Sequence, residues 1–353
     1  MALICRAPIT YPTDVDEGEK QTLAVLGAGS WGIAIARHLD RIGHTVRLWE
    51  FDPEAAAYLI RERTLASKLP GITLADSIEV TNDLPETVAN VQAILLITPS
   101  TAIRGTAARL RECGVNAEVV INFAKGIDIE TGERMTEVIA DEFPGPPVVS
   151  LVGPSHAEEV ARDVPTAVVA ASTNPHAARH AQLLLSTDRF RVYTSDDPIG
   201  VEYGAALKNV VAIAAGITDG LGYESADNMK GALITRGLAE ITRLGVRMGA
   251  DPETFAGLSG VGDLVTTCLS RHSRNRYVGE QLGRGRKLAE ILDQMAMVAE
   301  GVNTTRAALR LADRFEVDMP IARAVGAVLF DDLPADRALV ELMSRPLQVE
   351  IRR

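Results

Sequence analysis

Cysteine is scarce in this chain: its 353 residues include only Cys5, Cys113 and Cys268. Because the three are odd in number, far apart and without a C-x-x-C pair, they argue against a disulfide framework and a zinc site. The six histidines show no metal-ligand spacing either, so we expect no metal. This cysteine usage fits a reducing cytoplasm, where we expect the protein to reside.

Long apolar runs and an excess of positive charge are also missing. No run approaches the roughly 18 apolar residues of a transmembrane helix, so we expect no stable membrane insertion. The net charge of −11 is unfavourable for binding nucleic acid, and an anionic substrate would need a local basic cluster. Residues 1–20 lack the basic start and apolar core of a signal peptide, and we interpret them as a poorly ordered N-terminal extension.

The rest of the chain divides at about Ser195. Before this point short apolar runs alternate with helical patterns, which is typical of parallel βαβ units whose strands are buried on both faces. The predicted strands cover residues 23–26, 45–49, 93–98, 118–122, 148–152 and 167–171. The later helical patterns cover residues 196–220, 232–248, 252–258, 287–297, 304–314 and 319–330. We therefore predict an α/β Rossmann domain with a mostly parallel sheet over residues 21–195, followed by an all-α substrate-binding domain over residues 196–353.

A glycine-rich loop follows the first predicted strand. Residues 27–32, GAGSWG, match the pattern G-x-G-x-x-G and open a predicted helix over residues 30–42. Gly27, Gly29 and Gly32 let the chain turn tightly and approach a pyrophosphate, which would sit at the helix N-terminus. The order of strand, loop and helix makes this short pattern specific enough to predict a dinucleotide site.

Two further strand ends belong to the same edge of the predicted sheet. Glu50 ends the second strand, where a carboxylate would hydrogen-bond the ribose hydroxyls of NAD and repel the 2′-phosphate of NADP. The alternative is a solvated turn residue before Asp52 and Pro53. Pro99 and Ser100 end another strand, at the rim where open α/β sheets bind ligands.

Lys208 is the first candidate for chemistry. It shares a helical stripe with Val201, Ala205 and Ala212, and a lysine on such a stripe is costly to bury unless it is paired or functional. Desolvation lowers the pKa of a lysine, which suits a general base. The alternatives are a snorkelling lysine or one paired with a structural acid such as Glu202.

Other polar residues carry open alternatives. Lys125 follows a strand and could reach a substrate oxygen or the cofactor, or lie in a surface turn. Asp263 could be a helix N-cap or a carboxylate that pairs with Lys208. The donors of residues 273–276, SRNR, form either an anion trap or a solvated basic turn. We predict a structural rather than a nucleophilic role for Cys268, because no nearby electropositive motif activates it.

Seven ordered segments resemble the NAD(P)-dependent glycerol-3-phosphate dehydrogenases, from about Gln21 to Leu347. They are residues 27–32 (GAGSWG), 124–126 (AKG), 153–157 (GPSHA), 206–210 (ALKNV), 232–237 (ALITRG), 262–268 (GDLVTTC) and 273–276 (SRNR). The resemblance implies reversible reduction of dihydroxyacetone phosphate to sn-glycerol 3-phosphate, which feeds glycerophospholipid synthesis. It also implies a homodimer.

The resemblance further implies roles for individual residues. Lys208 would donate and accept the proton, Lys125 would touch both substrate and cofactor, and Asp263 would line the catalytic pocket. The implied substrate contacts are Lys125, Gly153, Ser155, Lys208, Asp263, Thr267, Ser273, Arg274 and Asn275. With the loop and Glu50, the predicted cofactor contacts are Gly27, Gly29, Ser30, Trp31, Gly32, Glu50, Phe51, Lys125, Ala157, Arg274, Val298 and Glu300.

The chain departs from the bacterial pattern at two places that matter for the site. His156 stands where phenylalanine is common, and Glu50 with Phe51 stands where many bacterial members carry a small residue and then a basic one. We therefore expect NAD as the cofactor, with NADP as the alternative. A 3-hydroxyacid or 6-phosphogluconate dehydrogenase and a non-catalytic dinucleotide sensor are the rival readings. The SRNR cluster argues against the former, and Lys208 on its apolar stripe argues against the latter.

Overall fold

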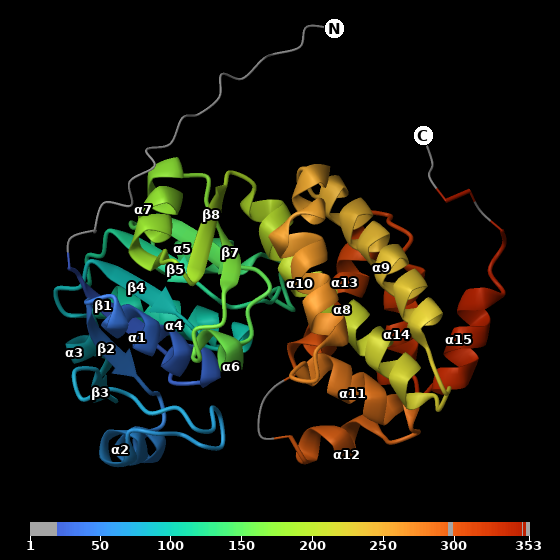
Figure 1. The fold of residues 1–353 in the computed structure, drawn as a ribbon. Coiled ribbons are helices and arrows are strands. Elements are labelled where there is room, and N and C mark those ends of the chain that lie inside the picture. Colours follow the sequence, from blue (N-terminus) through green and yellow to red (C-terminus); the bar gives the residue numbers. More distant parts are fainter. Residues whose placement is uncertain (1–19, 296–298, 348, 351–353) are drawn as a thin grey trace, which may run out of the picture.

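The computed structural model describes residues 20–295, 299–347 and 349–350. A lobe built on a β-sheet and a helical lobe lie side by side (Figure 1). Of the N-terminal extension predicted over residues 1–20, only Lys20 belongs to the described residues. The predicted change of pattern at Ser195 falls at the end of the last strand.

In the described residues, eight strands form one sheet in the order β3-β2-β1-β4-β5-β6-β7-β8. The strands are β1 (Thr22–Leu26), β2 (Thr45–Trp49), β3 (Glu79–Thr81), β4 (Ala93–Leu96), β5 (Val119–Asn122), β6 (Val148–Val152), β7 (Thr166–Ala171) and β8 (Phe190–Ser195). All neighbours pair in parallel except β6 and β7, which are antiparallel. The prediction of a mostly parallel sheet is therefore confirmed, although β3 and β8 were not predicted.

Helices cover both faces of this sheet (Figure 1). They are α1 (Ser30–Arg41), α2 (Pro53–Glu62), α3 (Leu84–Val88), α4 (Ser100–Glu112), α5 (Met135–Glu142), α6 (Ala157–Val160) and α7 (Pro175–Leu185). Alternate residues of β1 serve the two faces, because Leu23 and Val25 belong to one hydrophobic core while Ala24 and Leu26 belong to the other. Burial on both faces explains the unbroken apolar runs in the sequence.

The direction in which the strands are added reverses between the neighbours β1 and β4. A crevice for ligands forms at such a switch point, outside the carboxyl ends of the strands. The glycine-rich loop follows β1 and Pro99 precedes α4, so both flank this position.

The second lobe is helical throughout its described residues. Its helices are α8 (Pro198–Gly220), α9 (Asp227–Arg247), a 3-10 helix (Pro252–Ala256), a π-helix (Leu258–Gly262), α10 (Asp263–Leu269), α11 (Arg274–Gly283), α12 (Leu288–Asp293), α13 (Glu300–Arg314), α14 (Pro320–Phe330) and α15 (Ala335–Met343). α8 is buried along almost its whole length, with the other long helices around it. The helical pattern over residues 252–258 corresponds to the 3-10 helix and the start of the π-helix, whereas α10, α11 and α15 were not predicted.

α8 and α11 cross so closely that their backbones touch. A Cβ atom on Gly216 would overlap the carbonyl group of Arg276, and one on Gly279 would overlap the carbonyl group of Ile213. Only glycine fits at these two positions. This contact, which we call the glycine seam, sets the place of the α11 N-terminus relative to α8.

Candidate active site

The glycine-rich loop has the shape of a pyrophosphate cradle. Gly27 has a φ of +113°, and a Cβ there would lie 3.0 Å from the carbonyl oxygen of Ile97. A Cβ on Gly32 would overlap the carbonyl group of Gly27, whereas nothing lies within 4 Å of the position of a Cβ on Gly29. The loop therefore leaves open space beside Gly29 at the N-terminus of α1, where a phosphate group is favourable.

Glu50 and Phe51 follow β2 with different exposure. The Glu50 side chain is buried at 9% exposure, accepts the N–H of Asp52 at 3.2 Å, and lies 3.7 Å from the ammonium of Lys68. The interpretation of Glu50 as a solvated turn residue is therefore wrong. Phe51 is 68% exposed, and the guanidinium of Arg109 lies 5.7 Å from its ring centroid. Glu50 thus offers a fixed carboxylate beside an accessible aromatic ring.

Two lysines meet one carboxylate between the lobes. Lys208 of α8 donates to Asp263 Oδ1 at 2.5 Å and to Thr267 Oγ1 at 2.6 Å. Lys125, which follows β5, donates to Asp263 Oδ2 at 2.9 Å and to the carbonyl oxygen of Gly153 at 3.0 Å. Asp263 therefore joins a lysine from each lobe, with Lys208 at 4% and Asp263 at 2% exposure.

The charges of this cluster shift one another's protonation. Burial lowers the pKa of Lys208 to about 8, although the Asp263 carboxylate acts in the opposite direction. Burial alone would raise the pKa of Asp263, but the charges of Lys125 and Lys208 outweigh it and hold the pKa below its usual range. The cluster thus combines a permanent carboxylate with a lysine that can exchange a proton near neutral pH.

The structure decides the alternatives left open for these residues. Glu202 does not pair with Lys208, because its carboxylate is held by Arg134 and Thr136. Asp263 is not an N-cap, since it is the first residue of α10 and its carboxylate contacts the lysines. Burial raises the pKa of Cys268 to about 12, which leaves the thiol unreactive, as a structural role requires.

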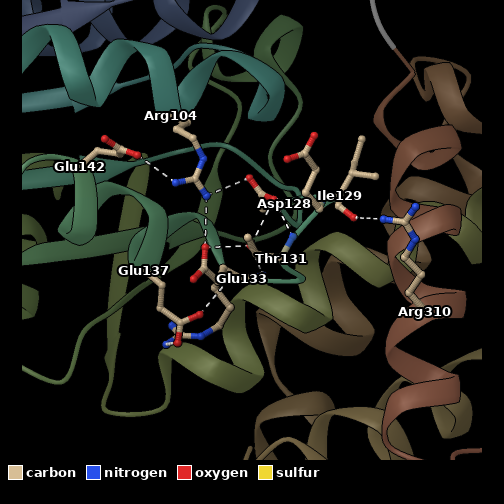
Figure 2. A network of polar contacts seen from close by, with 10 residues as sticks. Arg104, Asp128, Ile129, Thr131, Glu133, Glu137, Glu142 and Arg310 are labelled. Carbon is tan, nitrogen blue, oxygen red and sulfur yellow. Dashed lines mark hydrogen bonds and ion pairs between the residues drawn. The ribbon is translucent and has the colours of Figure 1, made fainter.

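The segment that follows Lys125, residues 128–133, is tied to both lobes (Figure 2). From the helical lobe, Arg310 of α13 donates to the carbonyl oxygen of Ile129 at 2.6 Å. From the other side, the guanidinium of Arg104 on α4 binds three carboxylates at 3.0 to 3.2 Å. They belong to Asp128, Glu133 and Glu142. These contacts hold the chain just beyond Lys125 in place.

The start of α13 reaches the same corner of the site. Glu300 accepts the backbone N–H of Ser100 at the start of α4 at 3.1 Å. Ser100 in turn fills the space at Gly126, where a Cβ atom would overlap the serine side chain. Glu300, Ser100 and the Lys125 segment therefore lie together, while the predicted contact Val298 lies outside the described residues.

The chain after β6 lines the site from the sheet lobe. Ser155 donates its hydroxyl to the Gly153 carbonyl at 2.8 Å, and Trp31 donates to the Ser155 carbonyl at 3.2 Å. Ala157 is buried at the start of α6. His156 lies 5.9 Å from the ring of His272, and burial, followed by the charges of Lys125 and Lys208, lowers its pKa. This segment therefore connects the glycine-rich loop with the lysine cluster.

The SRNR cluster begins α11, beside the glycine seam. Ser273 caps the helix by accepting the N–H of Arg276, and Asn275 accepts the N–H of Gly301 at 2.9 Å. Arg276 binds Asp219 at 2.7 Å, which commits it to a structural pair. Arg274 is exposed, which is compatible with both alternatives for the cluster. Ser273, Asn275 and Arg276 thus make contacts within the protein, and the anion-binding role of the cluster stays a prediction.

Sequence reasoning did not find Lys68, Arg104 or Arg310. Each is a charged residue in a segment without a motif, and only the folded chain shows which carboxylate or carbonyl group it contacts. Within the described ranges, no group of three or more histidine, cysteine or acidic side chains could hold a metal ion. No helix of the described part is long and apolar enough to cross a membrane.

Comparisons with known proteins cover nearly the whole chain. Two family models match it: the NAD-dependent glycerol-3-phosphate dehydrogenase N-terminus over residues 22–178, and the C-terminus of the same enzyme over residues 197–340. A protein of Chlorobium luteolum is 49% identical over 92% of this chain and 97% of its own length. A protein of Geobacter sulfurreducens is 49% identical over 94% of this chain and 99% of its own length. Both relatives are named glycerol-3-phosphate dehydrogenase (NAD(P)+). The crystal structure of glycerol-3-phosphate dehydrogenase from Coxiella burnetii superposes with a TM-score of 0.88 at 37% identity, covering 92% of this chain and 99% of that one.

Proposed function

The chain belongs to the NAD-dependent glycerol-3-phosphate dehydrogenase family, and we propose from this premise that it interconverts dihydroxyacetone phosphate and sn-glycerol 3-phosphate. It is an oxidoreductase that uses NAD or NADP. The observation that carries the proposal is the contact of the buried Lys208 and the partly buried Lys125 with a single buried carboxylate, Asp263. This arrangement offers a proton and a second positive charge to one substrate oxygen.

The residues of the sheet lobe fit the cofactor. The open space beside Gly29 suits the pyrophosphate, and the buried carboxylate of Glu50 suits the ribose hydroxyls of the adenosine half. When bound, NAD(P)H supplies the hydride that C2 of the substrate receives. The residues that would hold the cofactor are Gly27, Gly29, Ser30, Trp31, Gly32, Glu50, Phe51, Lys125, Ala157, Arg274, Val298 and Glu300.

Lys208 is the proposed proton donor in reduction and proton acceptor in oxidation. With a pKa of about 8, both its charged and its neutral form are populated within about one unit of neutral pH. Asp263 and Thr267 hold its ammonium, so the proton-bearing nitrogen has a fixed position before the substrate arrives. A donor held in this way loses little freedom in the transition state.

Lys125 is proposed to stabilise the negative charge that develops on the C2 oxygen. Its ammonium is oriented by Asp263 and by the carbonyl oxygen of Gly153, and a preorganised cation is an effective electrostatic catalyst. Gly153 and Ser155, which are joined by a hydrogen bond next to Lys125, are proposed as further substrate contacts. The cluster therefore separates proton transfer by Lys208 from charge stabilisation by Lys125.

The phosphate of the substrate is proposed to bind at the start of α11. Arg274 offers a guanidinium fork that matches a phosphate, and Ser273 and Asn275 are its neighbours in the sequence. Thr267, which contacts Lys208, is a further proposed substrate contact. The phosphate contact is remote from C2, so its binding energy can position the reacting carbon. The glycine seam fixes the position of α11 relative to α8, the helix that carries Lys208.

We further propose a cytoplasmic homodimer that supplies glycerophospholipid synthesis. Two unpaired cysteines, the half-buried Cys113 and the buried Cys268, fit a reducing compartment. The subunit number is measurable by sedimentation equilibrium of the purified protein. A single species of 37.8 kDa would contradict the dimer.

The function is tested by following nicotinamide absorbance with the purified protein. We expect oxidation of NADH to depend on dihydroxyacetone phosphate, and dihydroxyacetone without its phosphate to be a much poorer substrate. Rival substrates are a 3-hydroxyacid and 6-phosphogluconate, assayed with the oxidised cofactor. Turnover of either rival without turnover of glycerol 3-phosphate would contradict the proposal.

A further inference from the structure

A segment after α2 touches both the glycine-rich loop and Glu50. The carbonyl oxygen of Lys68 accepts the hydroxyl of Ser30 at 2.6 Å, and the ammonium of the same lysine lies 3.7 Å from Glu50 Oε2. Leu69 is fully buried, and Arg162 donates to the carbonyl oxygen of Pro70 at 2.9 Å. The backbone of Lys68 is therefore anchored, while its side chain is one-third exposed at the edge of the dinucleotide site.

Lys68 adds a positive charge beside the carboxylate of Glu50. The sequence pattern predicted only the negative charge of Glu50 at this place. A lone carboxylate at the end of β2 would repel the 2′-phosphate of NADP. Lys68 lies within ion-pair distance of that carboxylate and offsets its charge. A lysine has a compact ammonium on a flexible stem, so it can turn from the carboxylate to a phosphate without moving the backbone.

We propose that Lys68 is a determinant of cofactor choice: its ammonium binds the 2′-phosphate of NADP(H) beside Glu50, so that a site with an NAD-type carboxylate also accepts NADPH. With NADH, Lys68 stays paired with Glu50, whose carboxylate oxygens have further lone pairs that can accept the ribose hydroxyls. The inference rests on the proposed function, because it assigns Glu50 to the adenosine ribose. It adds a residue that the sequence pattern does not contain.

The test compares Lys68→Met with the unchanged protein, using kcat/KM for NADPH and NADH with dihydroxyacetone phosphate. We expect the value for NADPH to fall by roughly ten- to a hundredfold, as for loss of a charge-assisted hydrogen bond, and the value for NADH to change by less than about threefold. Lys68→Arg keeps the positive charge and should retain most of the NADPH activity.

Lys287→Met is the matched control. Lys287 makes an exposed ion pair with Asp332 in the helical lobe. Its replacement by methionine therefore removes one positive charge, as Lys68→Met does, but at a place outside the proposed cofactor contacts. It should leave both kcat/KM values unchanged. The inference would be overturned if Lys68→Met lowered kcat/KM equally for NADH and NADPH, or lowered neither value. It would also be overturned if the unchanged protein could not use NADPH.

Cofactor binding is measured separately by nicotinamide fluorescence, which requires no turnover. A selective loss of NADPH affinity in Lys68→Met supports the inference even if dihydroxyacetone phosphate is not reduced, in which case only the proposed function fails. Equal affinities of the variant and the unchanged protein for NADPH overturn the inference even if the reaction proceeds as proposed.

Discussion

Replacing Asp263 by asparagine should shift the pH dependence of the reaction. The substitution keeps the shape of the side chain but removes the negative charge that contacts Lys208 and Lys125. The two ammonium groups then remain in a buried site without a counter-ion. Since the neutral form of Lys208 relieves their repulsion, the pKa of Lys208 must fall.

The size of this effect follows from the contact. Two opposite charges roughly 4 Å apart interact by about 4 kcal/mol at an effective dielectric constant near 20, and the contact of Lys208 with Asp263 is shorter. At about 1.4 kcal/mol per pKa unit, removal of the carboxylate lowers the pKa of Lys208 from about 8 by up to roughly 3 units.

A rise in pH should have opposite effects on the rates of the two directions of the reaction. In the proposed mechanism reduction needs the charged form of Lys208, so its rate should fall as pH rises through the pKa of Lys208. In the variant this fall occurs at a lower pH, and reduction at about pH 7 slows by roughly ten- to a hundredfold. Oxidation needs the neutral amine, so its rise with pH also begins at a lower pH.

The assay is a pair of pH profiles of kcat/KM, one for each direction, recorded for the unchanged protein and the variant. Circular dichroism and NADH binding serve as controls that the variant is folded. An unaltered midpoint in both profiles would refute the assignment of Lys208 as the titrating group. A shift to higher pH would refute the electrostatic account of the cluster.

Four other substitutions test separate parts of the site. Lys208→Ala should lower kcat by more than about a hundredfold, as for loss of a general acid, while NADH binds with nearly unchanged affinity; near-normal turnover would exclude the proton role. Arg274→Ala should raise the KM for dihydroxyacetone phosphate by roughly tenfold or more, and an unchanged KM would remove it from the phosphate contacts. Arg104→Met should lower kcat more than it lowers cofactor affinity, because it frees the segment beyond Lys125; an equal effect on both would indicate a general loss of structure. Gly216→Ala should lower the free energy of unfolding by about 1–3 kcal/mol in urea titration, and unaltered stability would contradict the backbone contact in the glycine seam.

Most of the sheet could be predicted from the sequence because its central strands are buried on both faces. Such strands produce unbroken apolar runs, and β1 is an example. β8 was missed because its first four residues alternate between buried and exposed positions, and β3 because it has only three residues. Both missed strands lie at the edges of the sheet, where the apolar signal is weakest.

The lysine cluster could be predicted only in part. Lys208 could be identified because a lysine on an otherwise apolar helical stripe is costly to bury unless it is paired or functional. The partner of that lysine could not be deduced from spacing, since Asp263 lies 55 residues away and Glu202 was an equally good candidate. The catalytic roles of these residues remain predictions for the experiments above.

Lys68 and the contacts of Arg104 were beyond sequence reasoning for a physical reason. A charged residue in a polar segment has the same local pattern whether it faces water or a carboxylate of another element. The glycine seam is similar, because Gly216 and Gly279 look like ordinary interruptions of a helix until their backbones are seen in contact. In both cases the information lies in how distant segments meet.

The glycine seam also has a consequence for the length of the substrate in the proposed mechanism. Because main-chain atoms of α8 and α11 are in direct contact, no side chain there can adjust the separation of Lys208 from the start of α11. A larger residue at Gly216 or Gly279 would push the helices apart and move the start of α11 away from Lys208. If these two places bind opposite ends of the substrate, as proposed, the seam sets the distance between the carbonyl oxygen and the phosphate that the site accepts.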